Sequence, residues 1–274
     1  MKQFILDKEP DRDGLVRISG DDYRYLVKVR RLAAGEYFTA LLPNGNETQV
    51  QVVTIDGNVL TVKCEANEQL KTQHETDGYP RIILFQALPK GDKMDLIVRQ
   101  AAESGIAQIV PFVSEFSVAK TGAGGQKFSR WEKIIKEARQ QSGSKIATSL
   151  HVPLSIEELF DYWKKLKETQ KQGTAGILFH HQEIKNYPKK GLEQKSLHRY
   201  LNNEPGIVVP AIGPEGGFSD KEAVLFMENG FNPITIGDTI LRTETAALYC
   251  TAAIRVLLLE KDSWELKQPK PNNG

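Results

Sequence analysis

The chain has 274 residues, of which 40% are hydrophobic and 26% are charged, and its formal net charge is +1. This length has room for two domains, and the near-neutral charge argues against a broadly basic protein that binds nucleic acid without specificity, although it permits a local basic patch. The longest apolar runs are much shorter than the roughly 20 residues that a membrane-spanning helix needs, so we expect no contact with a membrane.

The first 70 residues have the pattern of a small β-rich domain. Strands are predicted at 37–42, 49–55 and 59–64, because these runs are rich in β-branched and aromatic residues. An Asn-Gly turn follows the first strand and an Asp-Gly turn follows the second, and both dipeptides favour tight hairpins. The pattern therefore predicts a small β-barrel over 1–70, followed by a polar linker over 71–80.

From residue 81 onward, strand patterns alternate with helix patterns. Helices are predicted at 93–104, 129–142, 156–167 and 243–259, and a Ser-x-x-Glu capping box at Ser219 and Glu222 predicts the start of another. Such alternation is typical of an α/β domain with a mostly parallel sheet covered on both faces. We place this domain at 81–264 and expect a disordered tail over 265–274. Its strands are predicted at 82–87, 107–113, 175–179, 206–212 and 233–236.

Two blocks near the C-terminus predict a ligand site. The strand at 206–212 leads directly into Gly213-Pro214-Glu215-Gly216-Gly217, where glycines allow sharp turns and close approach to a ligand. The second block, Ile240–Ala247, follows another turn at Gly237 and enters a helix. Two such strand-end loops indicate a site at the carboxyl ends of parallel strands. The chain has no Gly-x-Gly-x-x-Gly fingerprint and no phosphate loop, so a nucleotide-like cofactor would need another architecture.

These two blocks, together with Leu88–Met94, Phe4 and the segment Tyr25–Leu32, resemble the ribosomal RNA small subunit methyltransferase E family. This family belongs to the SPOUT class of S-adenosylmethionine-dependent RNA methyltransferases, and the resemblance covers nearly the whole chain. It implies an N-terminal PUA-like RNA-binding β-barrel and a C-terminal SPOUT α/β domain with a deep trefoil knot. It also implies a homodimer that methylates N3 of a uridine in 16S ribosomal RNA near the decoding region.

The resemblance assigns the cofactor pocket to the two C-terminal blocks, with the strand end at 178–180 as a third wall. We expect Glu215 to organise its loop rather than to touch the substrate. The residues that the resemblance places at S-adenosylmethionine are Leu178, Phe179, His180, Gly213, Pro214, Glu215, Gly216, Ile236, Gly237, Leu241, Thr245 and Ala246.

Arg242 is the candidate catalytic residue. A cation at the start of a helix is disfavoured by the helix dipole, so it needs an anionic partner, either Glu244 or an RNA phosphate. We expect Arg242 to stabilise negative charge that develops on the target base during methyl transfer. The alternative is a solvated charge with no role. No residue in the sequence stands out as a general base.

A basic cluster in the N-terminal domain is the candidate RNA-binding surface. It consists of Arg24, Lys28, Arg30 and Arg31, with tyrosines interleaved, and it could contact phosphates and stack on unpaired bases. The other interpretation is an ordinary amphipathic helix face. Tyr25 stands where the family commonly has a histidine, a change that keeps stacking and removes imidazole chemistry.

Two further departures from the family pattern remove an arginine. Phe116 precedes Ser117-Val118 where the family often has arginine, and Gly143-Ser144-Lys145 follows Gln141-Ser142 where an arginine is also common. Lys120 and Lys145 are candidate RNA-binding replacements, although lysine lacks the forked donor geometry of arginine. Three alternatives therefore stay open: a different RNA target, methylation of a ribose 2′-hydroxyl, and a non-catalytic RNA-binding factor for ribosome assembly.

The cysteines and histidines predict no metal site. Only Cys64 and Cys250 are present and they lie far apart, which argues against a disulfide framework and favours the reducing cytoplasm. The five histidines lack the spacing of metal ligands. His180 and His181 are adjacent, so in a strand they would face opposite ways, and we expect one to be packed and the other exposed.

Overall fold

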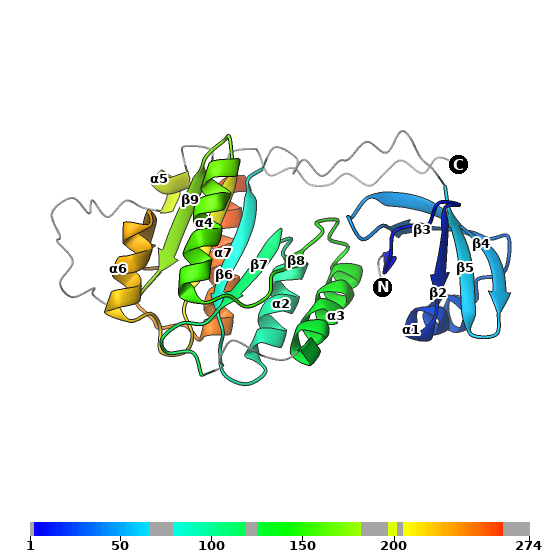
Figure 1. The fold of residues 1–274 in the computed structure, drawn as a ribbon, viewed down its shortest axis with the longest axis horizontal. Coiled ribbons are helices and arrows are strands. Elements are labelled where there is room, and N and C mark those ends of the chain that lie inside the picture. The colour runs from blue at the N-terminus through cyan, green and yellow to red at the C-terminus, as the bar shows by residue number, and fades with distance from the viewer. Residues whose placement is uncertain (1–2, 66–78, 119–124, 182–196, 202–204, 260–274) are drawn as a thin grey trace. The chain divides into compact units, whose positions relative to one another are not determined.

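The computed structural model describes residues 3–65, 79–118, 125–181, 197–201 and 205–259 (Figure 1). The chain divides into two compact units. The first holds the N-terminal sheet with Val98–Ala107 and Gln126–Ser149, and the second holds the described parts of Tyr79–Ile97, Gln108–Gly125 and the chain from Leu150 onward. Most of the predicted linker and the whole predicted tail lie outside the described residues, and the proposed domain boundaries stay a prediction.

A five-stranded sheet with the strand order β1-β3-β4-β5-β2 forms the centre of the first unit. The β3–β4, β4–β5 and β5–β2 pairs are antiparallel, whereas β1 and β3 are parallel. Gly45 and Gly57 have φ values of 90° and 55°, which confirms the Asn-Gly and Asp-Gly hairpin turns. The strands are β1 (Phe4–Ile5), β2 (Leu15–Ile18), β3 (Tyr37–Leu41), β4 (Glu47–Asp56) and β5 (Val59–Cys64).

Alternating side chains of this sheet pack into one apolar core. Phe4 and Phe38 meet edge to face, with ring centroids 5.9 Å apart, and Leu26 is fully buried beside the strands. Leu26 comes from the basic segment, which forms α1 (Gly20–Tyr23) and a π-helix, η1 (Arg24–Val29). The helix α3 (Gly125–Ser142) belongs to this unit from residue 126 onward, and its Lys136 lies 2.5 Å from carboxylate oxygens of both Asp7 and Asp22.

The second unit is built on a parallel sheet with the strand order β11-β9-β10-β6-β7-β8. All six residues of β10 are buried, as expected for a strand covered on both faces. The pairings of β10 with β6 and β9, of β11 with β9 and of β6 with β7 are parallel. The strands are β6 (Arg81–Ala87), β7 (Gln108–Phe112), β8 (Ser149–Leu150), β9 (Thr174–Phe179), β10 (Ile207–Ile212) and β11 (Phe231–Ile234).

The last strand was predicted two residues too late. The expected strand at 233–236 is β11, which begins at Phe231 and ends at Ile234. The ring of Phe231 is buried against Trp163 and Phe226, and this packing fixes where the strand begins. Pro233 is tolerated inside the strand because β11 lies at an edge of the sheet and pairs only with β9.

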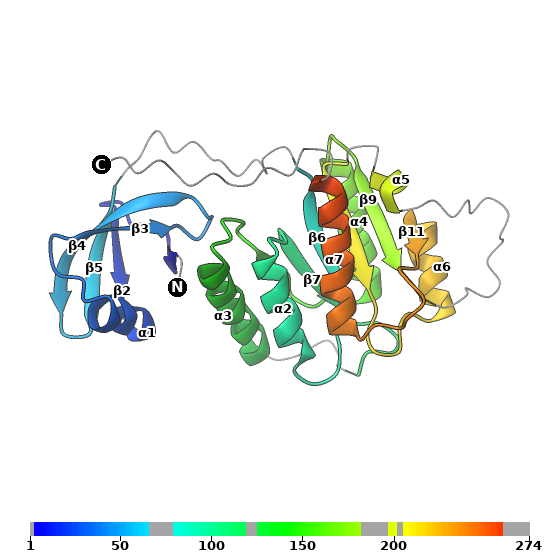
Figure 2. The same cartoon turned by 180° about the vertical axis from the view of Figure 1, so that it is seen from behind.

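Helices cover both faces of this sheet (Figures 1 and 2). On one face, α4 (Ile156–Thr169) and α6 (Asp220–Glu228) share an aromatic core with Phe85 of β6 and Phe231 of β11. On the other face, α7 (Thr243–Leu259) contacts β10 and β6. Ser219 and Glu222 form both halves of the capping box at the start of α6, which confirms the predicted helix start. The remaining helices are α2 (Lys93–Glu103) and α5 (Leu197–Leu201).

Candidate functional site

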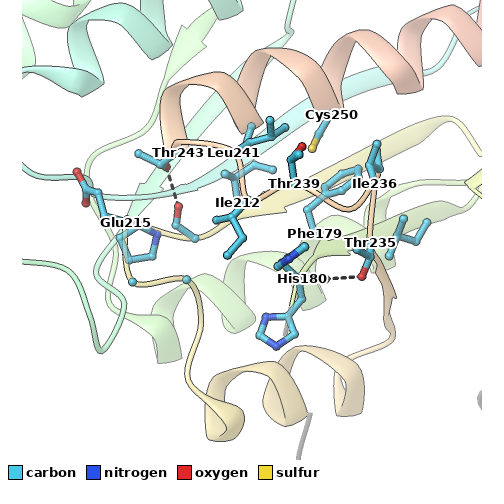
Figure 3. A pocket seen from close by; sticks show the side chains of 18 residues that line it. Phe179, His180, Ile212, Glu215, Thr235, Ile236, Thr239, Leu241, Thr243 and Cys250 are labelled. Carbon is cyan, nitrogen blue, oxygen red and sulfur yellow. Dashed lines mark hydrogen bonds between the residues drawn. The ribbon is translucent and has the colours of Figure 1, made fainter. Parts of the chain in front are cut away.

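The carboxyl ends of four neighbouring strands lie at the same level of the sheet. Phe179 of β9 is paired with Ile212 of β10 on one side and with Ile234 of β11 on the other, and Ile212 is also paired with Gln86 of β6. The loops that follow these strands therefore open at one edge. A cavity of about 230 Å³ lies there (Figure 3). It is lined by Phe179, His180, His181, Ile212, Gly213, Pro214, Glu215, Gly216, Gly217, Ile234, Thr235, Ile236, Thr239, Ile240, Leu241, Thr243, Ala246 and Cys250.

The loop after β10 closes tightly on itself. The backbone N–H of Gly217 donates to the carbonyl of Pro214 at 2.9 Å, and Gly217 has a φ of 71°. A Cβ atom on Gly213 would lie 2.9 Å from the carbonyl carbon of Gly217, closer than real Cβ atoms come to backbone. Glycine is thus required at 217 by the backbone angle and at 213 by the close approach of two chain segments.

A chain of buried hydrogen bonds fixes the start of α7 to this loop. The Thr243 hydroxyl donates to the carbonyl of Gly213 at 2.7 Å, as drawn in Figure 3. The Gln86 amide donates in turn to the Thr243 hydroxyl at 3.1 Å and to the carbonyl of Ala87 at 2.9 Å. Neither side chain was among the predicted site residues. Gln86 could have been found, because a single amide inside an apolar strand must have a buried partner.

Glu215 organises the loop, as the sequence favoured. Its carboxylate accepts hydrogen bonds from the backbone N–H of Lys90, at 3.1 and 3.2 Å, and from the Lys93 ammonium at 2.7 Å. Partial burial raises the pKa of Glu215, but these hydrogen bonds outweigh that effect and hold the pKa below its ordinary value. The loop after β10 is therefore fastened to the loop after β6.

His180 forms the third wall of the cavity, next to the loop after β11. The Thr235 hydroxyl donates to the carbonyl of His180 at 2.8 Å, and the backbone N–H of His180 donates to the carbonyl of Ile234 at 3.1 Å. The imidazole is buried, and burial lowers the pKa of His180 although Asp220 opposes this. His181 is exposed, which confirms that the two histidines point to different environments.

The structure brings most of the predicted cofactor residues together and places three elsewhere. Leu178 is buried in the core shared with α4 and α6, because neighbouring residues of a strand point to opposite faces. Gly237 is an exposed turn glycine with a φ of 72°, and Thr245 is exposed on α7. The predicted residues that do line the cavity are Phe179, His180, Gly213, Pro214, Glu215, Gly216, Ile236, Leu241 and Ala246.

Arg242 precedes α7 and is exposed. Its carbonyl accepts from the backbone N–H of Ala246 at 2.7 Å, which begins the helix. Glu244, one of its two predicted partners, lies instead 3.9 Å from the ammonium of Lys93. Arg242 forms no ion pair with any acidic side chain in the described parts of the chain.

The predicted RNA-binding cations are exposed where the structure describes them. Arg24 lies 3.7 Å from Asp21, and the Arg30 guanidinium lies 5.7 Å from the centre of the Phe38 ring. Lys145 lies 3.2 Å from Glu47 at the surface. Lys28 and Arg31 are exposed as well, and Arg31 has a left-handed φ of 58°. Lys120 lies outside the described residues.

Metal and thiol chemistry find no support in the described residues. They contain no group of three or more histidine, cysteine or acidic side chains that could hold a metal ion. Both cysteines are buried and free, and burial raises the pKa of Cys250 to about 12. The Cys250 thiol at the cavity therefore stays protonated and is a poor nucleophile. None of the helices that can be described is long and apolar enough to cross a membrane.

Most of the chain matches known proteins. Residues 77–255 match the model of the RNA methyltransferase domain family. The chain is 29% identical to ribosomal RNA small subunit methyltransferase E 2 of Borreliella burgdorferi, over 94% of this chain and 98% of that protein. It is 30% identical to ribosomal RNA small subunit methyltransferase E of Aquifex aeolicus, over 81% and 86%.

A solved structure has the same fold. The crystal structure of ribosomal RNA small subunit methyltransferase E from Neisseria gonorrhoeae, bound to S-adenosylmethionine, superimposes with a TM-score of 0.68. The superposition covers 94% of this chain and 98% of that one at 23% identity. The α/β architecture described above is thus shared with an enzyme of known ligand.

Proposed function

The chain belongs to the ribosomal RNA small subunit methyltransferase E family of RNA methyltransferases, and on this basis we propose that it methylates N3 of a uridine in 16S ribosomal RNA near the decoding region, with S-adenosylmethionine as methyl donor. The observation that carries the proposal is the cavity at the carboxyl ends of β9, β10 and β11, which lie side by side in the sheet. Both C-terminal sequence blocks line it, and they are the blocks on which the family resemblance rests.

The residues at the cavity fit S-adenosylmethionine. The backbone of the glycine loop lines the cavity together with the apolar side chains of Ile212, Ile236 and Leu241, a combination typical of pockets for small polar ligands. Thr235 and Thr239 add hydroxyl groups. When bound, S-adenosylmethionine supplies a methyl group that is already activated by its sulfonium.

The protein's own residues would then orient the reacting groups, shield them from water and stabilise the charge on the uridine. The cavity walls hold the reacting groups in line and exclude water. Arg242, exposed at the start of α7 and without an acidic partner among the described residues, stabilises the negative charge on the uridine after its N3 proton has passed to solvent water. The target base must leave its stack to reach the cavity.

Nucleoside analysis tests the proposed reaction. Small ribosomal subunits from a strain that lacks the gene are incubated with the protein and S-adenosylmethionine, and the RNA is then digested for mass spectrometry and mapped by primer extension. We expect one new 3-methyluridine in 16S ribosomal RNA. A methyl group on ribose or on another RNA would contradict the substrate, and binding without any methylation would favour the assembly factor.

We also propose the two fold details that the family implies, a PUA-like barrel in the N-terminal unit and a trefoil knot in the C-terminal unit. The five-stranded sheet supports the first. The second is supported by the chain order: β11 lies at the sheet edge beside β9, whereas α7, which follows it, contacts β10 and β6. The segment 235–242 must therefore cross the ends of inner strands.

Charge reversal at Arg30 and Arg31 tests the proposed RNA-binding surface. We expect the double change to glutamate to weaken RNA binding and to reduce its salt dependence, because each lost phosphate contact removes about one released counterion. Affinity for S-adenosylhomocysteine should stay unchanged. The measurement is filter binding at several salt concentrations, and reversal of Lys164 and Lys165, two exposed lysines on α4, is the matched control. Normal RNA binding by the double variant would mean that the basic cluster is only a solvated surface.

We propose that the protein is a homodimer. The outer side of α7 exposes Leu248, Tyr249 and Val256, an apolar surface that a monomer would leave in water. Multi-angle light scattering at micromolar concentration should give twice the mass of the chain, 30.7 kDa. The change Tyr249→Glu should shift the mass toward the monomer, whereas a monomeric wild type would contradict the proposal.

A further inference from the structure

Three loops beside the cavity are fastened to one another by side chains. The Ser117 hydroxyl, in the loop after β7, donates to the carbonyl of Leu88, in the loop after β6, at 2.9 Å. Glu222, a buried carboxylate at the start of α6, accepts from the Ser114 hydroxyl at 3.2 Å and from the Glu115 backbone N–H at 2.9 Å. With the contacts of Glu215, these bonds hold the loop at 114–117 against the glycine loop.

This arrangement places the ring of Phe116 beside the cavity lining. A Cβ atom on Gly216, which lines the cavity, would lie 3.0 Å from Cβ, 3.2 Å from Cγ and 3.3 Å from Cδ2 of Phe116. The ring therefore occupies the space that any side chain at 216 would need. Because both neighbours of Phe116 in its loop are hydrogen-bonded, the ring is presented by a fixed backbone.

The Phe116 side chain is nevertheless 45% exposed, so packing within the unit does not account for it. An aromatic ring with one side against a backbone and the other in solvent is a surface on which a planar group can stack. Lys90, in the loop fastened to Glu215, adds an exposed cation suited to a phosphate.

We propose that Phe116 is a specificity-determining residue that stacks on an unpaired base of the RNA at the mouth of the cavity. The inference rests on the proposed function, since a base that is methylated must leave its helix and a base beside it loses its neighbour. Proteins recognise such unstacked bases by stacking them on aromatic side chains. Where the family pattern has an arginine, this chain would hold its substrate by stacking instead of by charge.

Substitution of Phe116 separates stacking from charge and from simple packing. We expect Phe116→Ala to lower kcat/KM for small ribosomal subunits by about 10- to 100-fold, the effect of losing one base–aromatic stack. The slope of log kcat/KM against log salt concentration should not change, because no phosphate contact is lost. Phe116→Trp and Phe116→Tyr should restore activity, whereas Phe116→Leu should not. Val118→Ala, an exposed neighbour, is the matched control.

Further measurements keep this test apart from the test of the proposed function. Direct binding of the target RNA without methyl donor should weaken in Phe116→Ala by the same factor, and this readout stands even if the wild type methylates nothing. Affinity for S-adenosylhomocysteine and the melting temperature should stay at wild-type values. Three results would overturn the proposal. The first is full activity of Phe116→Leu, and the second is a loss of cofactor affinity in Phe116→Ala equal to its loss of activity. The third is a change in the oligomeric mass of Phe116→Ala, which would assign Phe116 to the contact with a second copy of the chain.

Discussion

Replacing Gly213 with alanine should weaken binding of S-adenosylhomocysteine by about 10- to 100-fold. The new Cβ atom would lie 2.9 Å from the carbonyl carbon of Gly217, and neither backbone segment can move without opening the turn. Overpacking of this kind costs roughly 1–3 kcal/mol, which corresponds to the stated change in the dissociation constant. The displaced carbonyl of Gly213 would also lose the hydrogen bond from Thr243.

Isothermal titration measures this effect, and another glycine is the matched control. Gly125 begins α3 with open space around its Cβ position, so Gly125→Ala should bind normally. Gly216 is not such a control, because it lines the cavity and a Cβ atom there would lie 3.0 Å from the Cβ of Phe116, whose backbone is held by hydrogen bonds on both sides. Equal affinity in wild type and Gly213→Ala would show that the turn tolerates the methyl group or does not bind the cofactor.

Replacing Arg242 with alanine should slow methyl transfer on the order of 100-fold if Arg242 stabilises the developing charge. The single-turnover rate with small ribosomal subunits is the measurement, since it reports chemistry and not product release. Affinity for S-adenosylhomocysteine should be unchanged, because Arg242 is not among the cavity-lining residues. Arg242→Lys keeps the charge and should keep part of the rate.

Two accompanying readouts distinguish this role from a solvated charge. The rate of Arg242→Ala should recover as the pH rises, because a cation that lowers the pKa of the imide becomes unnecessary once the base ionises unaided. The melting temperature should rise slightly, since removing a cation from the start of α7 relieves roughly 0.3–1 kcal/mol of unfavourable interaction with the helix dipole. A normal rate together with raised stability would mean that Arg242 has no part in the reaction.

The elements that sequence predicted well are those with a long or strongly marked pattern. The helix at 243–259 was placed with its observed bounds, and the capping box at Ser219 marked the start of α6. The strands β1 and β2 were missed, because two and four residues are too few to show alternation. The start of β11 was predicted at Pro233, two residues too late, because the packing of Phe231 determines where the strand begins.

The candidate site was also predicted only in part from the sequence. Glycine-rich loops at strand ends indicated where the cavity lies, but not which side chains reach it. Gln86 and Thr243 are more than 150 residues apart in the chain, and only the sheet pairing and the packing of α7 bring them to 3.1 Å. The contact between Phe116 and Gly216 is equally non-local, so the sequence could show the missing arginine but not what the phenylalanine touches.

The helix α7 has three sides in different surroundings. Thr243, Ala246 and Cys250 line the cavity, Ile254 and Leu258 are buried in the protein, and Leu248, Tyr249 and Val256 are exposed. Two of these sides are therefore occupied within the unit, and the third is more apolar than the outer face of an ordinary amphipathic surface helix. In evolutionary terms, the cavity-lining and buried positions of α7 can accept few changes, and new substrate preferences would arise more easily in the loops around it.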